Sequence, residues 1–174
     1  MKKAFIIILV MLLLFSLFAC SEGERVDLTE GTFFFGMTSI QLHPADYYGK
    51  HISFDCFTYR LTDVNGREYM CGVRKCSAGY GCKCGKDSVI GFILLYDGEI
   101  PEPKNQNVDT PDKSWIHVEG KLASAETTEI RLFAYDEDGQ IDYQREDSVK
   151  FCTFAVESLT VIEDYSSLAY YVVS

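Results

Sequence analysis

The segment KHISFDCFTYRLTDVNGREYMCGVR, residues 50–74, decides the fold. Its first part, residues 50–61, is rich in the β-branched and aromatic residues that favour strands. Asp-Val-Asn-Gly at 63–66 is a turn signal, because Asn and Gly tolerate the backbone conformations that a tight hairpin requires. The segment therefore predicts an antiparallel hairpin of residues 50–61 and 67–74.

The rest of the chain repeats this strand-and-turn pattern. Gly91 lies inside an apolar run and predicts a bulge or a tight bend there. The sequence DEDGQ at 136–140 predicts the turn of a second hairpin at 129–146. Many strands with few helical stretches predict an antiparallel sandwich or a small barrel. The further expected strands are at 88–96, 115–122, 129–135, 141–144 and 156–163.

The first 19 residues predict a signal peptide. Lys2 and Lys3 precede a short apolar stretch whose only polar residue is Ser16, and whose length and one-sided flanks do not suit a membrane span. Residues 17–20, Leu-Phe-Ala-Cys, resemble the lipobox of bacterial lipoproteins, in which the cysteine is diacylated and becomes the new N-terminus. Two acyl chains give stable anchoring. We therefore expect lipidation at Cys20, and a plain secretory signal is the alternative.

This N-terminus defines the expected organisation of the chain. Residues 1–19 are the signal peptide, residues 20–30 a lipidated tether, and residues 31–174 one domain, with ordered structure beginning near Leu28 or later. The expected location is the extracytoplasmic face of the cell membrane.

The charge of the chain argues against one class of partner. Sixteen Lys and Arg residues face 26 Asp and Glu residues, a formal net charge of −10, and loss of Lys2 and Lys3 makes it two units more negative. Affinity for nucleic acid depends on basic residues that neutralise phosphates, so we expect no nucleic-acid partner. The same charge repels anionic headgroups, so the lipid is expected to provide the membrane attachment.

Three stretches are similar to parts of small OB-fold domains. LHPADYYGKHISFDCFTYR at 42–60 resembles their opening, in which a helical turn with a proline leads into the first strand through Tyr48, Gly49 and Lys50. DKSWIHVEGK at 112–121 looks like a strand with a Trp-Xaa-Xaa-Val-Xaa-Gly pattern, and SLTVIEDYSSLAYYV at 158–172 looks like the final strand and tail.

These elements recur together in the YcgQ-like family of bacterial proteins, which the chain resembles over residues 40–173. The resemblance implies an OB-like domain that acts beside a membrane permease and is connected with zinc homeostasis. It also implies a pair of thiols, then an aspartate and a glycine, just before the third strand. Cys84, Asp87 and Gly91 match this pattern, and Cys82 stands for the other thiol.

Six cysteines remain when Cys20 is lipidated, and they allow 15 disulfide connectivities. Cys56 and Cys152 lie in strand patterns beside aromatic residues, so each is most simply a small buried hydrophobe. Cys82 and Cys84 are separated by one residue, and a disulfide between them would be strained. Metal binding, disulfides and unpaired thiols all remain open for the other four.

The sequence CSAGYGCKCGKD at 76–87 is the candidate metal site. Its glycines allow the backbone to turn back on itself, and nearby lysines lower thiol pKa values. Thiolates suit tetrahedral zinc and also copper(I). The expected ligands are Cys76, Cys82, Cys84 and Asp87, with Cys71 nearby.

Little in the sequence points to an enzyme. His43, His51 and His117 are scattered and are expected at the surface rather than as ligands. No serine lies in a nucleophile elbow, and no phosphate-binding loop is present. We therefore expect a non-catalytic binding module that takes zinc or another soft metal and acts with a membrane permease. The alternative is a protein whose thiols are redox-active or form a disulfide staple.

The sequence thus predicts a single, mainly β, OB-like Greek-key barrel of five principal strands. Residues 44–49 should form a helical turn before the first strand, and the hairpin at 129–146 should extend beyond the barrel. The residues expected to be mostly buried are Ile52, Phe54, Phe92, Leu94, Trp115, Val118, Leu132, Phe154, Leu159 and Val161.

Overall fold

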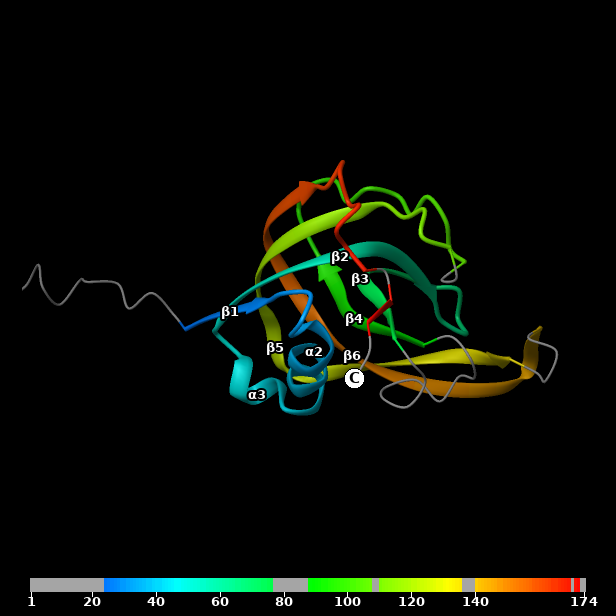
Figure 1. The fold of residues 1–174 in the computed structure, drawn as a ribbon. Helices are drawn as coiled ribbons and strands as arrows, with labels where there is room; N and C mark the ends of the chain where they lie inside the picture. The colour runs from blue at the N-terminus through cyan, green and yellow to red at the C-terminus, as the bar shows by residue number, and fades with distance from the viewer. Residues whose placement is uncertain (1–23, 77–87, 108–109, 136–139, 170, 173–174) are drawn as a thin grey trace, which may run out of the picture.

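The computed structural model describes residues 24–76, 88–107, 110–135, 140–169 and 171–172. The protein is mainly β in these residues, as the sequence predicts (Figure 1). Its elements are β1 (Arg25–Leu28), α2 (Phe33–Leu42), α3 (Pro44–Tyr47), β2 (His51–Thr62), β3 (Glu68–Cys76), β4 (Ser88–Leu95), β5 (Trp115–Tyr135), β6 (Ile141–Val161) and β7 (Tyr171–Val172).

The hairpin predicted from residues 50–74 is confirmed as β2 and β3, which pair antiparallel over their facing ends. Asp63 closes the turn, because its carboxylate oxygen Oδ1 accepts hydrogen bonds from the backbone N–H groups of Asn65 and Arg67, both at 2.8 Å. Gly66 has φ +80°, a left-handed conformation that glycine adopts without steric cost. The turn residues therefore set this hairpin as the sequence indicates.

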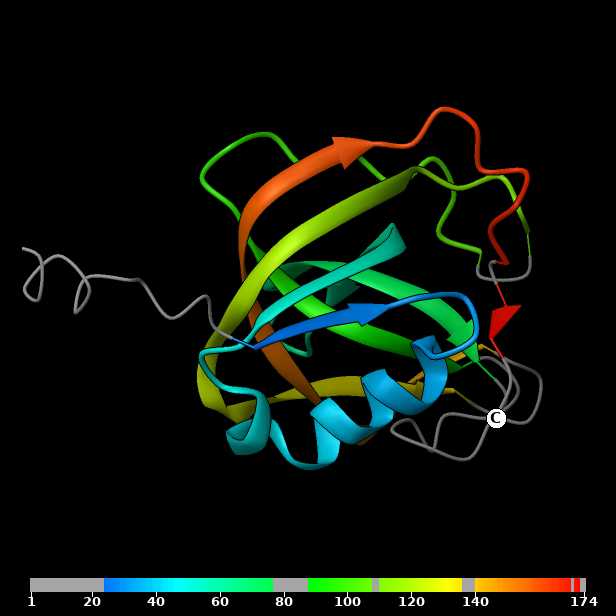
Figure 2. The same cartoon turned by 60° about the vertical axis from the view of Figure 1, so that its left-hand side comes forward.

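The seven strands of the described chain form one sheet in the order β1-β2-β5-β6-β4-β3-β7, and β3 also pairs with β2. The sheet therefore curls into a partial ring (Figures 1 and 2). The pairs β1–β2, β4–β6 and β3–β7 are parallel, which corrects the expectation of an antiparallel sheet. Parallel neighbours need long connections rather than tight turns, and the helices α2 and α3 provide one between β1 and β2.

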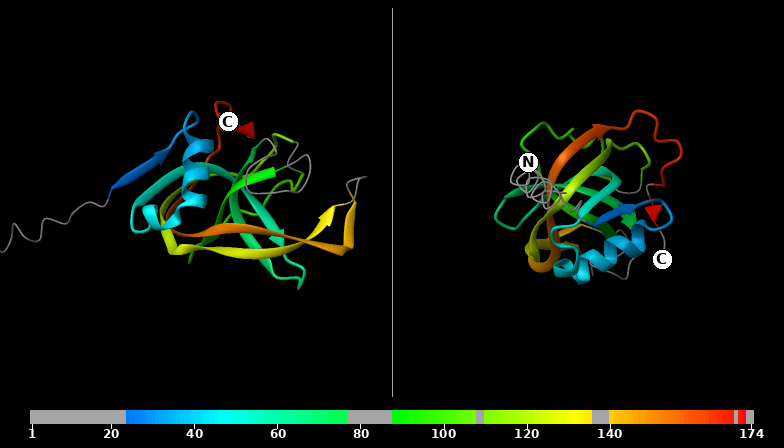
Figure 3. Two further views of the ribbon diagram at one scale, coloured as in Figure 1. Left: turned by 90° about the horizontal axis from the view of Figure 1, so that it is seen from below. Right: turned by 90° about the vertical axis from the view of Figure 1, so that its left-hand side faces the viewer.

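β5 and β6 form a hairpin much longer than the predicted one at 129–146, with 21 residues in each strand. In the described residues, β5 pairs with β2 through 115–120 and β6 pairs with β4 through 153–155. The segments 127–135 and 141–152 pair with each other and are called the β5–β6 ribbon below, and their far end projects from the ring (Figure 3). The strands predicted separately at 115–122, 129–135, 141–144 and 156–163 belong to these two long strands.

Ordered structure begins earlier than the sequence analysis indicates. β1 starts at Arg25, within the segment 20–30 for which a tether is predicted, and pairs with the first residues of β2. Leu28 is buried and Val26 packs against the core, since alternate residues of a strand share a face. The expected start near Leu28 is therefore too late, because apolar and charged residues already alternate at 25–28.

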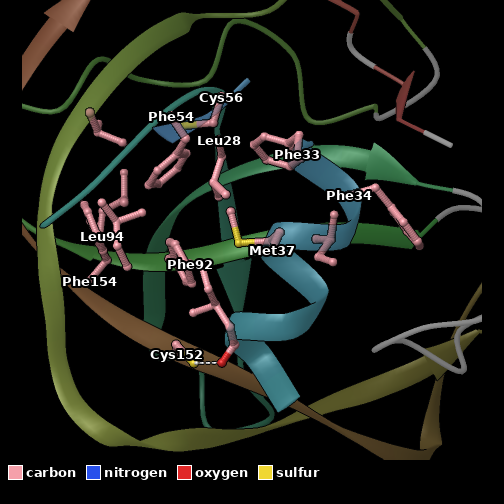
Figure 4. Packing of buried hydrophobic residues seen from close by; sticks show 14 of the residues in the cluster. Leu28, Phe33, Phe34, Met37, Phe54, Cys56, Phe92, Leu94, Cys152 and Phe154 are labelled. Atoms are coloured by element: carbon pink, nitrogen blue, oxygen red, sulfur yellow. Dashed lines mark hydrogen bonds between the residues drawn. The ribbon is translucent and has the colours of Figure 1, made fainter. Parts of the chain in front are cut away.

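Helix α2 supplies part of the core and is missing from the sequence prediction, whereas α3 confirms the helical turn predicted at 44–49. The buried residues of α2 follow helical spacing, and Figure 4 shows Phe33 and Met37 pointing into the interior where Phe54 and Phe92 of the strands also lie. These four residues are Phe33, Phe34, Met37 and Ile40.

Gln41, near the C-terminal end of α2, ties the helix to two strands. Its amide nitrogen donates to the backbone oxygen of Gly91 in β4, and its side-chain oxygen accepts from the backbone N–H of Cys152 in β6 at 3.0 Å. β4 and β6 pair directly over only three residues in the described chain. Gln41 therefore satisfies backbone groups beside the short β4–β6 ladder, which would otherwise cost stability.

The predicted core is largely confirmed. Leu132 and Leu159 are half-buried. Val161 is 49 % exposed, so its predicted burial is wrong. It is the last residue of β6 and lies beyond the β4–β6 ladder, which ends at Ala155. The confirmed residues, all buried, are Ile52, Phe54, Phe92, Leu94, Trp115, Val118 and Phe154.

Gly91 does not form the predicted bulge, because the β3–β4 ladder runs through it without a register shift. Instead, the backbone of β3 lies against it. A Cβ atom at Gly91 would lie 2.0 Å from the backbone oxygen of Gly72 and 2.8 Å from the Cα of Val73. The glycine is therefore required by a close approach of two backbones.

Gly91→Ala is expected to lower the free energy of unfolding by about 1–3 kcal/mol, because backbone atoms cannot move aside as a flexible side chain can. Urea denaturation of the variant and parent measures the change. Gly31→Ala is the matched control, since a Cβ there meets no atom within 4 Å. Equal stability of the two alanine variants would contradict the close approach.

Candidate functional site

The candidate site lies where β3 ends and β4 begins. The two strands pair antiparallel up to Cys76 opposite Ser88. The connecting segment, 77–87, therefore joins adjacent positions of the sheet. Cys82, Cys84 and Asp87 belong to this segment and lie outside the described residues.

Cys76 is the predicted ligand whose place at this end of the sheet is described. It is fully buried in the same hydrophobic cluster as Phe54 and Phe92. On its strand edge, β7 pairs with β3 so that Val172 lies beside Cys76. Burial raises the pKa of the Cys76 thiol to about 11. At neutral pH the thiol is therefore protonated, and metal binding would have to displace that proton.

Cys71 is not brought to Cys76. The two residues are five positions apart on β3, roughly 16 Å along a strand. An odd separation places them on opposite faces, and Cys71 packs in a different cluster, with Phe57 and Trp115. Burial raises the pKa of the Cys71 thiol to about 12. Its thiol makes a weak contact with the backbone oxygen of Tyr69 at 3.8 Å.

Cys56 and Cys152 are buried small hydrophobes, as predicted, and both thiols are free. Cys56 lies against Gly72, and Cys152 directs its thiol toward the backbone oxygen of Ile40 at 3.8 Å (Figure 4). Burial raises the pKa of both thiols, that of Cys152 to about 11. They are core residues rather than members of the candidate site.

Within the described ranges, no three His, Cys, Asp or Glu side chains are arranged to hold a metal ion. His43 is exposed. His117 places Nδ1 2.7 Å from the Asp55 carboxylate, and His51 places Nε2 3.3 Å from that of Glu157. These two histidines are half-buried and paired with carboxylates.

A buried arginine is the main polar feature that the sequence analysis misses. Arg74 is 1 % exposed, and its guanidinium lies over the rings of Phe33 and Trp115, at 4.6 and 5.2 Å from their centroids. It contacts Glu30 at 2.5 Å and donates to the backbone oxygen of Ala169 at 3.1 Å. The signal for it was the alternation in β3, because Arg74 shares a strand face with the buried Cys76.

In the part of the chain that the structure describes, no helix is long and apolar enough to cross a membrane.

The sequence profile of the DUF1980 C-terminal domain matches residues 17–134. The chain is also 29% identical over 107 residues to UPF0703 protein YcgQ of Bacillus subtilis (strain 168), a match that covers 60% of this chain and 32% of that protein. The chain thus spans about a third of the length of this relative. No solved structure matches it. Since the profile covers more than half of its residues, the chain belongs to the family of the DUF1980 C-terminal domain.

Proposed function

We propose that this protein is a non-catalytic, lipid-anchored binding module on the extracytoplasmic face of the cell membrane. Cys20 carries the lipid, and the segment 76–87 binds zinc or another soft metal. The module acts together with a membrane permease. The observation that supports the metal site best is the last residue pair of the β3–β4 ladder, in which Cys76 lies opposite Ser88.

The OB-like barrel is part of this proposal. The pairings run from β2 to β3, β4, β6 and β5 and then return to β2. A five-stranded, partly open Greek-key barrel has a circuit of this kind. The side chains of α2 pack into its interior. In such a barrel, a loop between neighbouring strands is well placed to hold a ligand at the end of a rigid scaffold.

The metal proposal follows from this closure. The 11 residues 77–87 join two positions that are paired across the sheet, Cys76 and Ser88. In this proposal, Cys82, Cys84 and Asp87 of that segment join Cys76 as ligands. Three thiolates and a carboxylate oxygen suit four-coordinate zinc. Cys71 is left out of the ligand set, because it faces the other cluster.

The lipid anchor and the permease rest on the sequence. The anchor is supported by the lipobox-like residues 17–20 and by the preceding apolar run. The permease partnership is supported by the resemblance to YcgQ-like proteins and by the 29% identity to UPF0703 protein YcgQ over 107 residues.

Cys82→Ser combined with Cys84→Ser is expected to reduce bound zinc from about one per chain to less than about a tenth, because half of the four ligands are lost. Metal content after purification without chelator measures this. Zinc affinity of the parent should rise about tenfold per pH unit for each thiol that is protonated in the free protein. Cys76 is one such thiol, since its pKa is raised to about 11.

Cys71→Ala is the matched control and should retain zinc, because Cys71 faces away from the site. Zinc retention by the double serine variant would disprove the metal site. A parent protein without metal that has lost two hydrogen atoms in mass, as a disulfide requires, would favour the thiol–disulfide alternative.

A further inference from the structure

The described chain enters the domain beside the turn that joins α3 to β2. The backbone oxygen of Glu24 accepts a hydrogen bond from the N–H of His51 at 3.1 Å. Its carboxylate pairs with the ammonium group of Lys50 at 2.9 Å. The segment 47–50, called the α3–β2 turn below, is therefore fixed against the point where the N-terminal segment arrives.

This entry point lies close to the proposed lipid, and the inference rests on that proposed lipidation. Three residues separate Cys20 from Glu24, and an extended chain covers at most about 3.6 Å per residue, so their Cα atoms lie within about 14 Å. A domain of this length is roughly 35–40 Å across. The connection is therefore too short to reach around the domain, and the end that carries the α3–β2 turn must face the bilayer.

The side chains of the turn suit the lipid–water interface. Tyr48 is 56 % exposed, and the ammonium group of Lys50 lies 5.2 Å from the centroid of the Tyr47 ring. Tyrosine is enriched at membrane interfaces, because its ring is apolar and its hydroxyl remains hydrated. Lysine extends its charge toward the polar layer while its methylene groups lie along apolar surface.

The β5–β6 ribbon occupies the opposite end of the molecule. β1 lies at one side of Figure 1 and the ribbon projects from the other side, and the view from below in Figure 3 agrees. The end of the ribbon carries Tyr143, which is 70 % exposed and contacts Phe133 with 5.1 Å between the ring centroids. Both ends of the domain therefore expose a tyrosine. The short connection between Cys20 and Glu24 brings only the end with Tyr48 to the membrane.

We propose that the α3–β2 turn lies in the headgroup layer of the phospholipid bilayer, with Tyr48 as its deepest side chain and the β5–β6 ribbon directed away from the membrane. The headgroup layer is about 5–7 Å thick on each side, so the short connection places the turn within its reach.

The test uses the full lipidated chain in phosphatidylcholine vesicles whose acyl chains are brominated near the headgroup. The tryptophan fluorescence of the Tyr48→Trp variant should be quenched at least about twofold more strongly than that of the matched variant Tyr143→Trp. Bromine quenches indole fluorescence only at short range, and the two positions lie at different depths. Trp115 is 2 % exposed and gives the same background in both proteins. Flotation of the vesicles reports attachment independently, with Cys20→Ser as its control.

Quenching of Y48W and not of Y143W in floating vesicles supports the orientation. Floating vesicles in which Y48W is not quenched, or is quenched no more than Y143W, overturn the orientation and leave the lipid anchor in place. If the full parent chain, mixed with the vesicles, does not float with them, both the lipid anchor and the orientation are overturned.

Discussion

Phe154→Ala is expected to lower the free energy of unfolding by about 3–5 kcal/mol, because it removes a large buried ring from the core. Phe154 is fully buried in β6. Its ring stacks on that of Phe92 at 5.3 Å and 9°, and meets that of Phe54 edge-on at 5.3 Å and 70°. The three rings come from three strands of the partial ring, so loss of the Phe154 ring leaves a cavity between strands that no single strand can close.

Urea denaturation measures the change, and Phe35→Ala is the matched control. Phe35 is 64 % exposed on α2, and its truncation should change stability by less than about 0.5 kcal/mol. A loss below about 1 kcal/mol for Phe154→Ala would mean that the three rings do not form the main core.

The strands could be predicted because their signals are local. Asp63 and Gly66 act within a few residues, and the strands around them follow from β-forming side chains. The continuity of β5 and β6 could not be predicted in this way. The sequence Ala-Ser-Ala-Glu between Leu122 and Thr127 has no large β-forming residue and suggests a break, whereas the structure accommodates it as a register shift inside one long hairpin.

Helix α2 was missed because its composition and its periodicity disagree. Its run of phenylalanines is typical of strands, and Gly36 disfavours a helix. The tertiary contact explains the glycine, since a Cβ atom there would lie 2.4 Å from Cδ2 of Leu28. The helical spacing of Phe33, Met37 and Ile40 was the signal that could have identified it.

The positions of candidate-site residues could be predicted only where the alternation of side chains along a strand determines which face they occupy. The pairing of Cys76 with Ser88 follows from the strands expected on either side of the segment. Cys71 was expected near the site, although its odd spacing from Cys76 places the two residues on opposite faces of β3. The position of Arg74 follows from the same alternation. Its partners could not be inferred, because Glu30 and Ala169 come from distant segments that meet only in the folded chain.

Arg74 explains how these distant segments are held together. Its Nε donates to the backbone oxygen of Asp55 at 2.9 Å, and its Nη1 reaches both Glu30 and Ala169. Glu30 in turn accepts a hydrogen bond from the N–H of Ala169 at 3.2 Å. One buried guanidinium and the carboxylate of Glu30, whose side chain is 39% exposed, thus join the connection before α2, the strand β3 and the C-terminal segment. A buried charge without its partner is costly.

Glu30→Ala is therefore expected to lower the free energy of unfolding by about 3 kcal/mol, because Arg74 remains buried without its counter-charge. Arg74→Met removes that charge, so adding Glu30→Ala to it should cost little more than Arg74→Met alone, and a double-mutant cycle in urea measures the difference. Glu24→Ala is the control, since it breaks an exposed pair with Lys50 and should leave the midpoint unchanged. Additive losses in the cycle would show that Glu30 does not stabilise the fold through Arg74.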